Sequence, residues 1–365
     1  MSKAAYLVLE NGRIFEGRFF GAQRDTLGEL VFSTGMVGYL ETLTDSSYYG
    51  QIVLQTFPLI GNYGVISQDL ESPSAKTNGY IAKSWCEEPS NFRSEGNLDT
   101  FLKAEDIPGI CGIDTREISK IIREEGVMNA KITGDADNID FDEIKNYKIT
   151  NAVENVSCKE IKFFDCEHSK YKVVLIDYGV KESIKQKLLD KGCGVCVVPH
   201  NTTAEQIKSM NPDGIVLSDG PGDPAENFEI TKNLKEIIKL NIPIFGICLG
   251  HQLLALANGF KTGKLKYGHR GANQPVKDLF TGRVYITSQN HGYEVITDSI
   301  DNNIAKISFK NVNDNTCEGI EYINKSVFSS QFHPDDCVSP HGTGFLFAKF
   351  IESIESMGKR TEENK

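Results

Sequence analysis

The sequence predicts an α/β protein with two domains, of which the second is built on a mostly parallel sheet flanked by helices. Three observations favour this fold class. A length of 365 residues suits two domains of ordinary size. After residue 172, short apolar runs alternate with amphipathic segments, which is typical of a parallel sheet covered on both faces. The first 134 residues instead mix strand-like runs with many glycines and predict a strand-rich, mixed α/β domain.

The N-terminal domain, predicted to span residues 1–134, opens with a β-hairpin. An Asn-Gly pair at residues 11–12 separates two strand-like runs, and this dipeptide is the strongest short-range hairpin signal. Later in the domain, isoleucines recur at helical spacing after Asp114, which is a plausible helix N-cap. The other short apolar runs do not decide a topology.

Residues 135–171 are polar and weakly periodic, and predict a linker with one short helix. The acidic run at 135–140 superficially suggests a calcium loop. However, Asp140 stands where such a loop needs glycine. The cysteines do not have further ligands at the spacing of a zinc site. We therefore expect no metal in this chain.

The second domain, predicted over residues 172–358, alternates strands and helices. The predicted strands cover residues 173–176, 194–199, 214–217 and 242–247, and the predicted helices cover 182–189, 204–210 and 228–240. Shorter strand-like segments follow at 283–287 and 326–332. A final amphipathic helix precedes a charged tail, 359–365, which we expect to fray.

Cys248 is the candidate nucleophile. It lies between an isoleucine-rich strand and a predicted helix, inside Gly246-x-Cys248-x-Gly250. A direct strand-to-helix turn strains its pivot residue, and glycines on either side remove the side chains that would collide there, as in a nucleophile elbow. The positive end of the following helix favours a thiolate. The alternative is a buried structural cysteine, which is common for free thiols.

A cysteine nucleophile needs a base, and His333 is the first candidate. It ends a strand-like run, a proline follows it, and Asp335 lies two residues further on as a possible orienting carboxylate. His251 lies three residues after Cys248 on the following helix and projects away from the sulfur, and His291 lies in a loop-like segment. His341 lies in a turn-rich stretch.

Three other motifs are weaker. Cys193 and Cys196 have redox spacing but begin a strand, whereas a redox pair starts a helix. The glycine-rich run 220–225 follows a strand, yet Asp223 would face the phosphates of a nucleotide, so we expect this loop to present amides to an oxyanion instead. The run 259–264 is too short for a phosphate-binding loop.

Composition limits the partners. A net charge of −11 argues against nucleic acid or an anionic membrane. No apolar run has the length of a signal peptide or membrane span. Nine cysteines, an odd number without regular spacing, suggest reduced thiols and a cytoplasmic location.

These motifs together resemble a known family. Phe-Gly-Ile-Cys-Leu-Gly-His-Gln at 245–252 and Gln-Phe-His-Pro-Asp at 331–335 resemble the signature of class I, triad-type glutamine amidotransferases. The loops 217–224 and 288–293 are similar to two further loops of that family. Five other segments resemble the small, glutaminase subunits of carbamoyl phosphate synthetases, namely 38–48, 60–64, 87–93, 109–116 and 266–273. The resemblance thus covers nearly the whole chain and is weakest in the linker.

The resemblance implies a chemistry and a set of roles. Cys248 attacks the side-chain amide of glutamine, His333 protonates the departing ammonia and activates water, and Asp335 orients His333. The backbone amides of Gly222 and Leu249 form the oxyanion hole. The residues implied to hold glutamine are Ser47, which reaches in from the N-terminal domain, and Gly220, Gln252, Asn290, Gly292 and Tyr293.

The resemblance also implies a partner. Ammonia would pass to a large synthetase subunit, on which ATP and magnesium are expected, and no cofactor is expected in this chain. The resulting heterodimer would make carbamoyl phosphate from bicarbonate, for pyrimidine or arginine biosynthesis. The alternatives are the glutaminase subunit of another synthase and a non-catalytic regulatory homologue.

Two positions depart from the family pattern. Asp335 stands where glutamate is usual, and Asp219 stands where asparagine is usual. Aspartate is one methylene shorter, so either the backbone lies closer to His333 or the contact is long or bridged by water. Asp219 adds a negative charge near the expected pocket.

Overall fold

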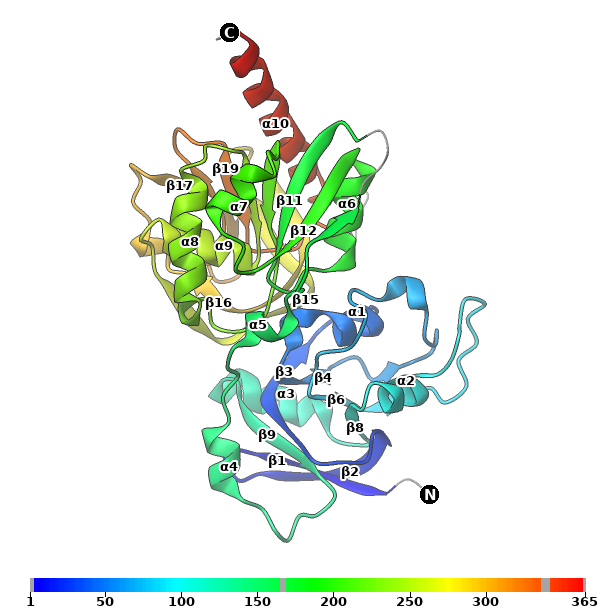
Figure 1. The fold of residues 1–365 in the computed structure, drawn as a ribbon. Helices are drawn as coiled ribbons and strands as arrows, with labels where there is room; N and C mark the ends of the chain where they lie inside the picture. The colour runs from blue at the N-terminus through cyan, green and yellow to red at the C-terminus, as the bar shows by residue number, and fades with distance from the viewer. Residues whose placement is uncertain (1–2, 165–168, 336–341, 364–365) are drawn as a thin grey trace. The chain divides into compact units, whose positions relative to one another are not determined.

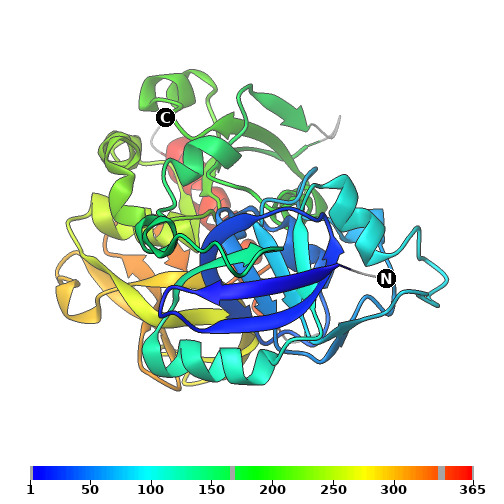
Figure 2. The ribbon, with the colours of Figure 1, turned by 90° about the horizontal axis from the view of Figure 1, so that it is seen from below.

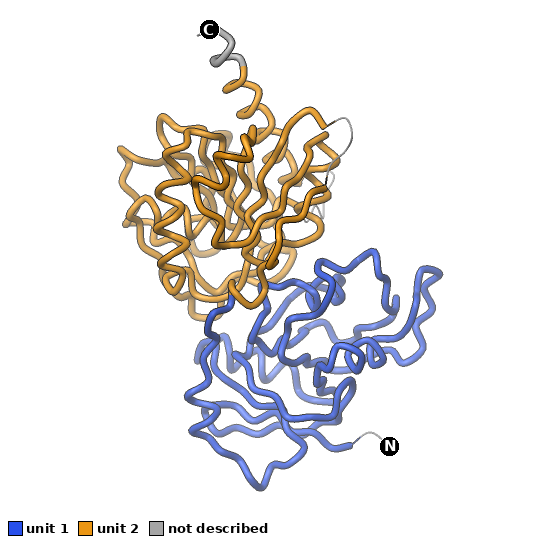
Figure 3. The backbone as a smooth tube through the Cα atoms, in the orientation of Figure 1, with its two compact units in different colours: residues 1–152 blue, residues 153–365 orange. Residues whose placement is uncertain are grey.

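The computed structural model describes residues 3–164, 169–335 and 342–363. The chain divides into two compact units, residues 1–152 and 153–365 (Figure 3). The fold is mixed α/β, and each unit contains its own sheet and its own core. Within the described residues, none of the helices combines the length and apolarity needed to cross a membrane.

Unit 1 is organised around a closed barrel in the order β1-β2-β8-β6-β4-β3-β9 (Figures 1 and 2). The predicted hairpin is confirmed, because β1 and β2 pair antiparallel and Gly12 between them has a φ of 89°. The barrel strands are β1 (Ala4–Leu9), β2 (Ile14–Gly21), β3 (Thr26–Ser33), β4 (Gln51–Gln55), β6 (Gly79–Ala82), β8 (Pro108–Cys111) and β9 (Met128–Thr133). A small separate sheet pairs β5 (Leu59–Ile60) with β7 (Ser84–Trp85).

Alternation along the barrel strands divides the core of unit 1 in two. On β4, Ile52 and Leu54 join the cluster that contains α3, whereas Val53 joins the cluster that contains α1 and α2. The predicted helix after Asp114 is confirmed, since the Asp114 side chain accepts a hydrogen bond from the Glu117 amide. The helices of this unit are α1 (Tyr39–Thr44), α2 (Leu98–Ala104), α3 (Thr115–Glu125) and α4 (Phe141–Asn146).

The segment expected to be a linker contributes elements to both units. In unit 1, Lys131 Nζ on β9 lies 2.8 Å from Glu143 Oε2 on α4, and the Tyr147 hydroxyl donates to the Gly50 carbonyl at 2.9 Å. The short helix α5 (Ala152–Val156) begins at the boundary between the units. In unit 2, β10 (Lys162–Phe164) pairs antiparallel with β12.

Unit 2 contains one ten-stranded sheet in the order β10-β12-β11-β13-β14-β19-β18-β16-β15-β17. The strands β12, β11, β13, β14 and β19 are parallel neighbours, as the alternating pattern predicts. The strands of this sheet after β10 are β11 (Tyr171–Asp177), β12 (Cys193–Pro199), β13 (Gly214–Leu217), β14 (Ile244–Ile247), β15 (Thr262–Asp278), β16 (Val284–Val295), β17 (Ala305–Asn311), β18 (Cys317–Tyr322) and β19 (Val327–Ser330).

Helices cover both faces of the parallel strands. Val173 and Leu175 on β11 face a core shared with α6 and α10, whereas Val174 and Ile176 face a core shared with α7, α8 and α9. The helices of this unit are α6 (Glu182–Asp190), α7 (Ala204–Ser209), α8 (Phe228–Ile238), α9 (Leu249–Ala257) and α10 (Phe345–Glu363).

The sheet is mixed rather than mostly parallel, which corrects the sequence-based expectation. The strands β18, β16, β15 and β17 extend it by antiparallel pairing. Only short strands were expected here, but β15 has 17 residues and β16 has 12. Their register shifts between Lys264 and His269 and again between Gly271 and Gln274. These irregularities break the alternation of buried and exposed side chains by which long strands are recognised.

The pair Cys193 and Cys196 is not a redox site. Both cysteines are buried on β12, and they belong to the two separate cores on opposite faces of the sheet. Burial is the first cause of the raised pKa of both thiols. This confirms the structural interpretation of the pair.

Candidate active site

Cys248 is the turn between a strand and a helix, as predicted. It links β14 to α9, and its backbone adopts φ 50° and ψ −102°. A positive φ is strained for a residue with a side chain and persists only where the surroundings impose it. Its amide donates to the Ser330 carbonyl at 2.8 Å, which ties the turn to the neighbouring strand β19.

The glycines on either side of Cys248 are required by close backbone packing. A Cβ atom on Gly250 would lie 2.5 Å from the carbonyl oxygen of Leu217, at the end of β13. A Cβ atom on Gly246 would lie 2.8 Å from the carbonyl oxygen of Gly250 and 2.7 Å from the Leu254 side chain. Any larger residue would therefore push α9 away from the sheet.

The sulfur of Cys248 contacts a side-chain amide and a backbone carbonyl. The side-chain amide of Gln331 donates a hydrogen bond to Sγ at 3.5 Å. Sγ in turn lies 3.6 Å from the backbone oxygen of Asn290, which can accept from the thiol. The sulfur is nearly enclosed, because Cys248 is only 2% exposed. The sulfur is therefore shielded from solvent and has a donor directed at the atom that would carry negative charge.

His333 follows the strand that neighbours the Cys248 strand. In the parallel pair of β14 and β19, Ile247 lies opposite Ser330, so Cys248 and His333 both lie beyond the carboxyl ends of adjacent strands. The His333 amide donates to the Ser288 carbonyl at 3.0 Å, and the side chain is buried. The sheet thus brings the two predicted catalytic residues to the same edge.

Of the two arrangements expected for Asp335 and His333, the structure shows the one with the longer contact. Its Oδ1 lies 3.9 Å from His333 Nδ1, which is outside the direct hydrogen-bond range. Its Oδ2 accepts a hydrogen bond from the Ser183 hydroxyl at 2.9 Å and lies 3.7 Å from Lys181 Nζ. The carboxylate is buried and held by residues at the start of α6. The neighbouring Asp336, another candidate, lies outside the described residues.

The glycine loop after β13 packs against the start of α9. A Cβ atom on Gly220 would lie 2.3 Å from the Tyr178 carbonyl oxygen and 2.9 Å from the Leu249 side chain. Gly222 has a φ of 89°, which favours glycine. The carbonyl of Ser218 accepts the amide hydrogen of Gly250 at 3.1 Å. The loop and the amides that begin α9 therefore lie close together.

Asp219, the second departure from the family pattern, lies in this loop. Its side chain is fully buried. The hydroxyl of its neighbour Ser218 donates to the Asp219 carbonyl at 2.7 Å and accepts from the Tyr178 amide at 2.9 Å. The backbone at Asp219 is thus fixed by hydrogen bonds on both sides of the loop.

Gln252 connects three parts of the site. Its side-chain amide donates to the Tyr293 carbonyl at 2.8 Å and to Gln331 Oε1 at 2.9 Å. Gln331 is the donor to Cys248, so Gln252 fixes the orientation of that amide. The segment 288–293, which looks loop-like in the sequence, is part of β16. Asn290, Gly292 and Tyr293 thus belong to a strand rather than a loop.

Ser47 is described within unit 1. It lies in the 3₁₀ turn Ser46–Tyr48, is 8% exposed, and its amide donates to Asp45 Oδ1 at 2.8 Å. Its predicted contact with glutamine stays a prediction.

The other candidate histidines have different roles. His251 Nδ1 lies 2.8 Å from the Ser329 hydroxyl, and burial lowers the pKa of His251 to about 3. His251 is therefore neutral, and it joins α9 to β19 through Ser329. Burial, followed by the charge of His269, lowers the pKa of His291, which hydrogen-bonds to Tyr293 and Gln289. His341 lies outside the described residues.

Gln331 begins the sequence motif at 331–335, and the family resemblance implies no role for it. The sequence nevertheless contains a signal for this residue. In an extended chain every second side chain points to the same face, so residues 329, 331 and 333 share one face at the end of β19. Ser329 contacts His251 and Gln331 contacts Cys248. A polar residue on the same face as His333 was therefore a candidate for the site. Lys181 and Ser183, which lie far from Asp335 in the sequence, had no comparable signal.

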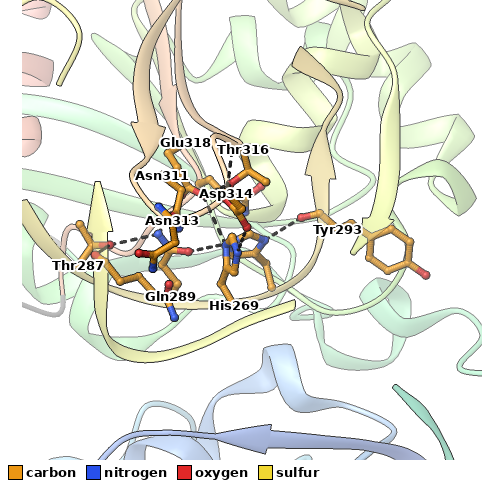
Figure 4. Close-up of polar contacts among 12 residues, drawn as sticks. His269, Thr287, Gln289, Tyr293, Asn311, Asn313, Asp314, Thr316 and Glu318 are labelled. Carbon is orange, nitrogen blue, oxygen red and sulfur yellow. Dashed lines mark hydrogen bonds and ion pairs between the residues drawn. The ribbon is translucent and has the colours of Figure 1, made fainter. Parts of the chain in front are cut away.

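A polar network, buried except near Asp314, lies on β15, β16, β18 and the connection that precedes β18 (Figure 4). Among the described residues, His269, His291 and Glu318 form a group whose ligand atoms lie within 4.8 Å of one another. His269 Nε2 lies 2.7 Å from Asp314 Oδ2, and Nδ1 lies 3.6 Å from Glu318 Oε1. Burial alone would lower the pKa of His269, but both carboxylates offset this and raise the pKa to about 9. The two carboxylate neighbours thus favour the protonated form of His269.

Comparisons with known proteins match both units. The family described as "Glutamine amidotransferase class-I" matches residues 174–353. The family described as "Carbamoyl-phosphate synthase small chain, CPSase domain" matches residues 7–132.

Curated relatives match almost the full length. A "Carbamoyl phosphate synthase small chain" of Bacillus cereus (strain ATCC 10987 / NRS 248) is 45% identical over 357 residues, which is 98% of each chain. A protein of the same name from Listeria monocytogenes serotype 4b (strain F2365) is 46% identical over 350 residues, covering 95% of this chain and 96% of the relative. Another from Fusobacterium nucleatum subsp. nucleatum is 46% identical over 352 residues, covering 96% and 98%.

Proposed function

Since the chain belongs to the carbamoyl-phosphate synthase small-chain family and is the glutamine-hydrolysing subunit of that enzyme, we propose that Cys248 and His333 carry out the hydrolysis. The observation that supports this assignment is the strained, buried Cys248 turn, with a hydrogen-bond donor on its sulfur and His333 at the end of the adjacent strand.

The proposed reaction has two steps. The proton of the Cys248 thiol passes to His333, and the sulfur attacks the side-chain carbonyl carbon of glutamine. The carbon–nitrogen bond then breaks, and His333 gives this proton to the departing ammonia. A glutamyl thioester remains. Water then attacks this thioester, and His333 accepts a proton from the water. The carbon–sulfur bond breaks, Cys248 is left as a thiolate beside the protonated His333, and glutamate is released.

The oxyanion of each step needs donors that are already in place. We assign this role to the backbone amides of Gly222 and Leu249. The support is that the glycine loop packs against the start of α9, with Gly220 close to the Leu249 side chain and the Ser218 carbonyl bonded to the Gly250 amide.

We propose a further set of residues as those that bind glutamine. Gly220, Asn290, Gly292 and Tyr293 lie on the loop and strand around Cys248, and Ser47 is assigned from unit 1. Gln252 acts at least in part by positioning other residues, because its side-chain amide donates hydrogen bonds to the Tyr293 carbonyl and to Gln331.

Asp335 is proposed as a positioning residue for His333. The distance of 3.9 Å between its Oδ1 and His333 Nδ1 leaves an electrostatic rather than a directly bonded contact. Ser183 and Lys181 keep the carboxylate in place. A weakly placed orienting residue is compatible with turnover. Removing the third member of a catalytic triad often lowers the rate less than removing the nucleophile does.

We also propose that a large synthetase subunit receives the ammonia and binds ATP and magnesium. The test is to purify the chain from native extract and to identify a co-purifying large subunit, then to assay carbamoyl phosphate synthesis with glutamine or with ammonia. Recovery of the chain alone, without glutaminase activity, would contradict the proposal.

A further inference from the structure

Three buried side chains from different strands of unit 2 bring atoms that can bind a metal close together (Figure 4). His269 lies on β15, His291 on β16 and Glu318 on β18. Each side chain offers one ligand atom, and these atoms lie within 4.8 Å of one another. Two imidazoles and one carboxylate are a set of ligands that zinc takes in proteins.

The hydrogen bonds of His291 leave one ring nitrogen facing a second acceptor. Nδ1 lies 2.8 Å from the Tyr293 carbonyl oxygen, which only accepts, so Nδ1 carries a hydrogen. On the other side of the ring, Nε2 lies 3.0 Å from Gln289 Oε1. In a neutral imidazole two lone pairs therefore face each other here. This contact needs a cation, which is either a second proton on His291 or a metal ion.

The Gln289 amide cannot be turned over to remove this conflict. Its nitrogen lies 2.9 Å from Glu318 Oε2 and 3.2 Å from the Thr287 hydroxyl. The hydrogen of that hydroxyl goes to the Gln274 carbonyl at 2.9 Å, so the Thr287 oxygen can only accept from Gln289. Both partners thus require the amide nitrogen, and the amide oxygen stays directed at His291.

Both histidines are oriented as metal-binding histidines usually are. Such residues donate the hydrogen of their second ring nitrogen to a carboxylate or a backbone carbonyl. His269 Nε2 lies 2.7 Å from Asp314 Oδ2, and His291 Nδ1 lies against the Tyr293 carbonyl. Within the described part of the chain, His269 Nδ1 is buried without a hydrogen-bond partner, and Glu318 Oε1 lies 3.6 Å from it.

The Glu318 carboxylate is fully buried and needs a positive charge beside it. In the metal-free chain the proton on His269 Nδ1 supplies that charge. This proton does not reach the contact between His291 and Gln289. One metal ion would satisfy both places, whereas each proton satisfies only one.

We propose that His269 Nδ1, His291 Nε2 and Glu318 Oε1 bind a divalent metal ion of the zinc class, with Gln289 Oε1 as the fourth ligand. The ion takes the place of the Nδ1 proton, which is released to solvent. Ligand atoms of a tetrahedral zinc site are about 3.4 Å apart, so small side-chain movements complete the site. Because Gln289 fills the fourth position, the ion is structural rather than catalytic.

The surroundings provide a path for the ion. The side chain of Asp314 is 41% exposed, so the network reaches solvent there. The ligands come from three separate strands. The sequence-based expectation of no metal considered the cysteines and the acidic run at 135–140, and neither includes these residues. The inference does not depend on glutamine hydrolysis.

Zinc binding to the full chain tests the site, with Zn²⁺ alone as the probe. Cys248→Ser serves as the parent, because it removes the active-site thiol as a competing ligand. After a chelator and then dialysis against zinc, mass spectrometry should find about one zinc ion per chain. His269→Asn or His291→Asn in this parent should weaken binding more than about 100-fold, since even the outer partners of metal ligands are worth about 10–100-fold.

His200→Asn is the matched control, because His200 follows β12 and lies outside the group. This variant should bind zinc like the parent. A parent that retains no zinc, or equal binding in all three histidine variants, would overturn the proposal.

Cobalt(II) provides a measurement that does not depend on whether the ligand variants fold. Bound to the Cys248→Ser parent, Co²⁺ should show the visible bands of a four-coordinate site without a sulfur-to-cobalt charge-transfer band, and Zn²⁺ should displace it. A sulfur band, or the spectrum of the hydrated ion, would overturn the site. Zinc should also raise the thermal unfolding midpoint of the parent, because an ion that binds the folded chain stabilises it.

Discussion

The side-chain amide of Gln331 donates a hydrogen bond to the sulfur of Cys248, across 83 positions of sequence. Gln331 cannot easily turn away, because its own oxygen accepts a hydrogen bond from Gln252. A donor fixed in this way stabilises negative charge on the sulfur before and after the thioester exists. We therefore propose Gln331 as a further residue that acts with Cys248 and His333.

Removing this donor should slow the chemistry of the thiol. A hydrogen bond to a charged group contributes about 1.5–3 kcal/mol, so Gln331→Leu should lower kcat/KM and the rate of Cys248 alkylation by iodoacetamide about tenfold or more. Gln331→Glu, which replaces the donor with a negative charge, should be worse. Unchanged alkylation in Gln331→Leu would show that the amide does not act on the sulfur.

Replacing the nucleophile should separate the two sources of nitrogen. Cys248→Ser should abolish carbamoyl phosphate synthesis from glutamine but preserve synthesis from added ammonia in the two-subunit enzyme, because ammonia bypasses the thiol step. The assay requires a check that the variant still binds its partner. Loss of both activities in an intact complex would argue against this division of roles.

Asp335 should matter less than Cys248. Asp335→Ala should lower kcat measurably, but less than Cys248→Ala, because the carboxylate is 3.9 Å from His333 and acts by orientation. Ser183→Ala, which retains the carboxylate and removes one contact to it, should have a milder effect.

The neighbouring carboxylate provides the control for this assignment. If Asp335→Ala turns over like wild type whereas Asp336→Ala is impaired, Asp336 is the third member. Thermal unfolding midpoints of these variants would distinguish a catalytic loss from a folding defect.

The glycine at position 250 should be intolerant of even one added methyl group. A Cβ there would lie 2.5 Å from the Leu217 carbonyl oxygen, so Gly250→Ala should destabilise the protein by about 1–3 kcal/mol and distort the Cys248 turn. Gly358→Ala is the matched control, since that position in α10 has no neighbouring atom within 4 Å. There, alanine should be neutral or stabilising by up to about 1 kcal/mol. Equal unfolding midpoints for both variants would contradict the packing argument.

Alkaline pH should lower the stability of folded unit 2, because His269 loses its proton. Asp314 and Glu318 raise its folded pKa to about 9 against burial, whereas the unfolded value is about 6.5. A raised folded pKa means that the stabilisation is fully present below about pH 6.5 and is lost as pH rises through about 9. The midpoint of thermal unfolding should therefore fall over this window more in wild type than in His269→Asn. Parallel curves for the two proteins would exclude a charged His269.

Local patterns in the sequence were sufficient for the features that depend on near neighbours in the chain. The Cys248 turn was predictable because the two glycines that permit it lie within two residues of it. The hairpin around Gly12 and the helix capped by Asp114 were predictable for the same reason. The parallel strands β11 to β14 followed from their alternation with helices.

Only the tertiary structure decided which distant segments meet. Sheet pairing places β19 beside β14 and so brings Gln331 to Cys248, and the start of α6 places Ser183 against Asp335, 152 positions away in sequence. The antiparallel half of the sheet was missed because the register shifts in β15 erase the period of two that marks a strand. Hydrophobic periodicity reports a residue's own strand or helix, whereas strand order and buried polar partners depend on contacts between segments far apart in the chain.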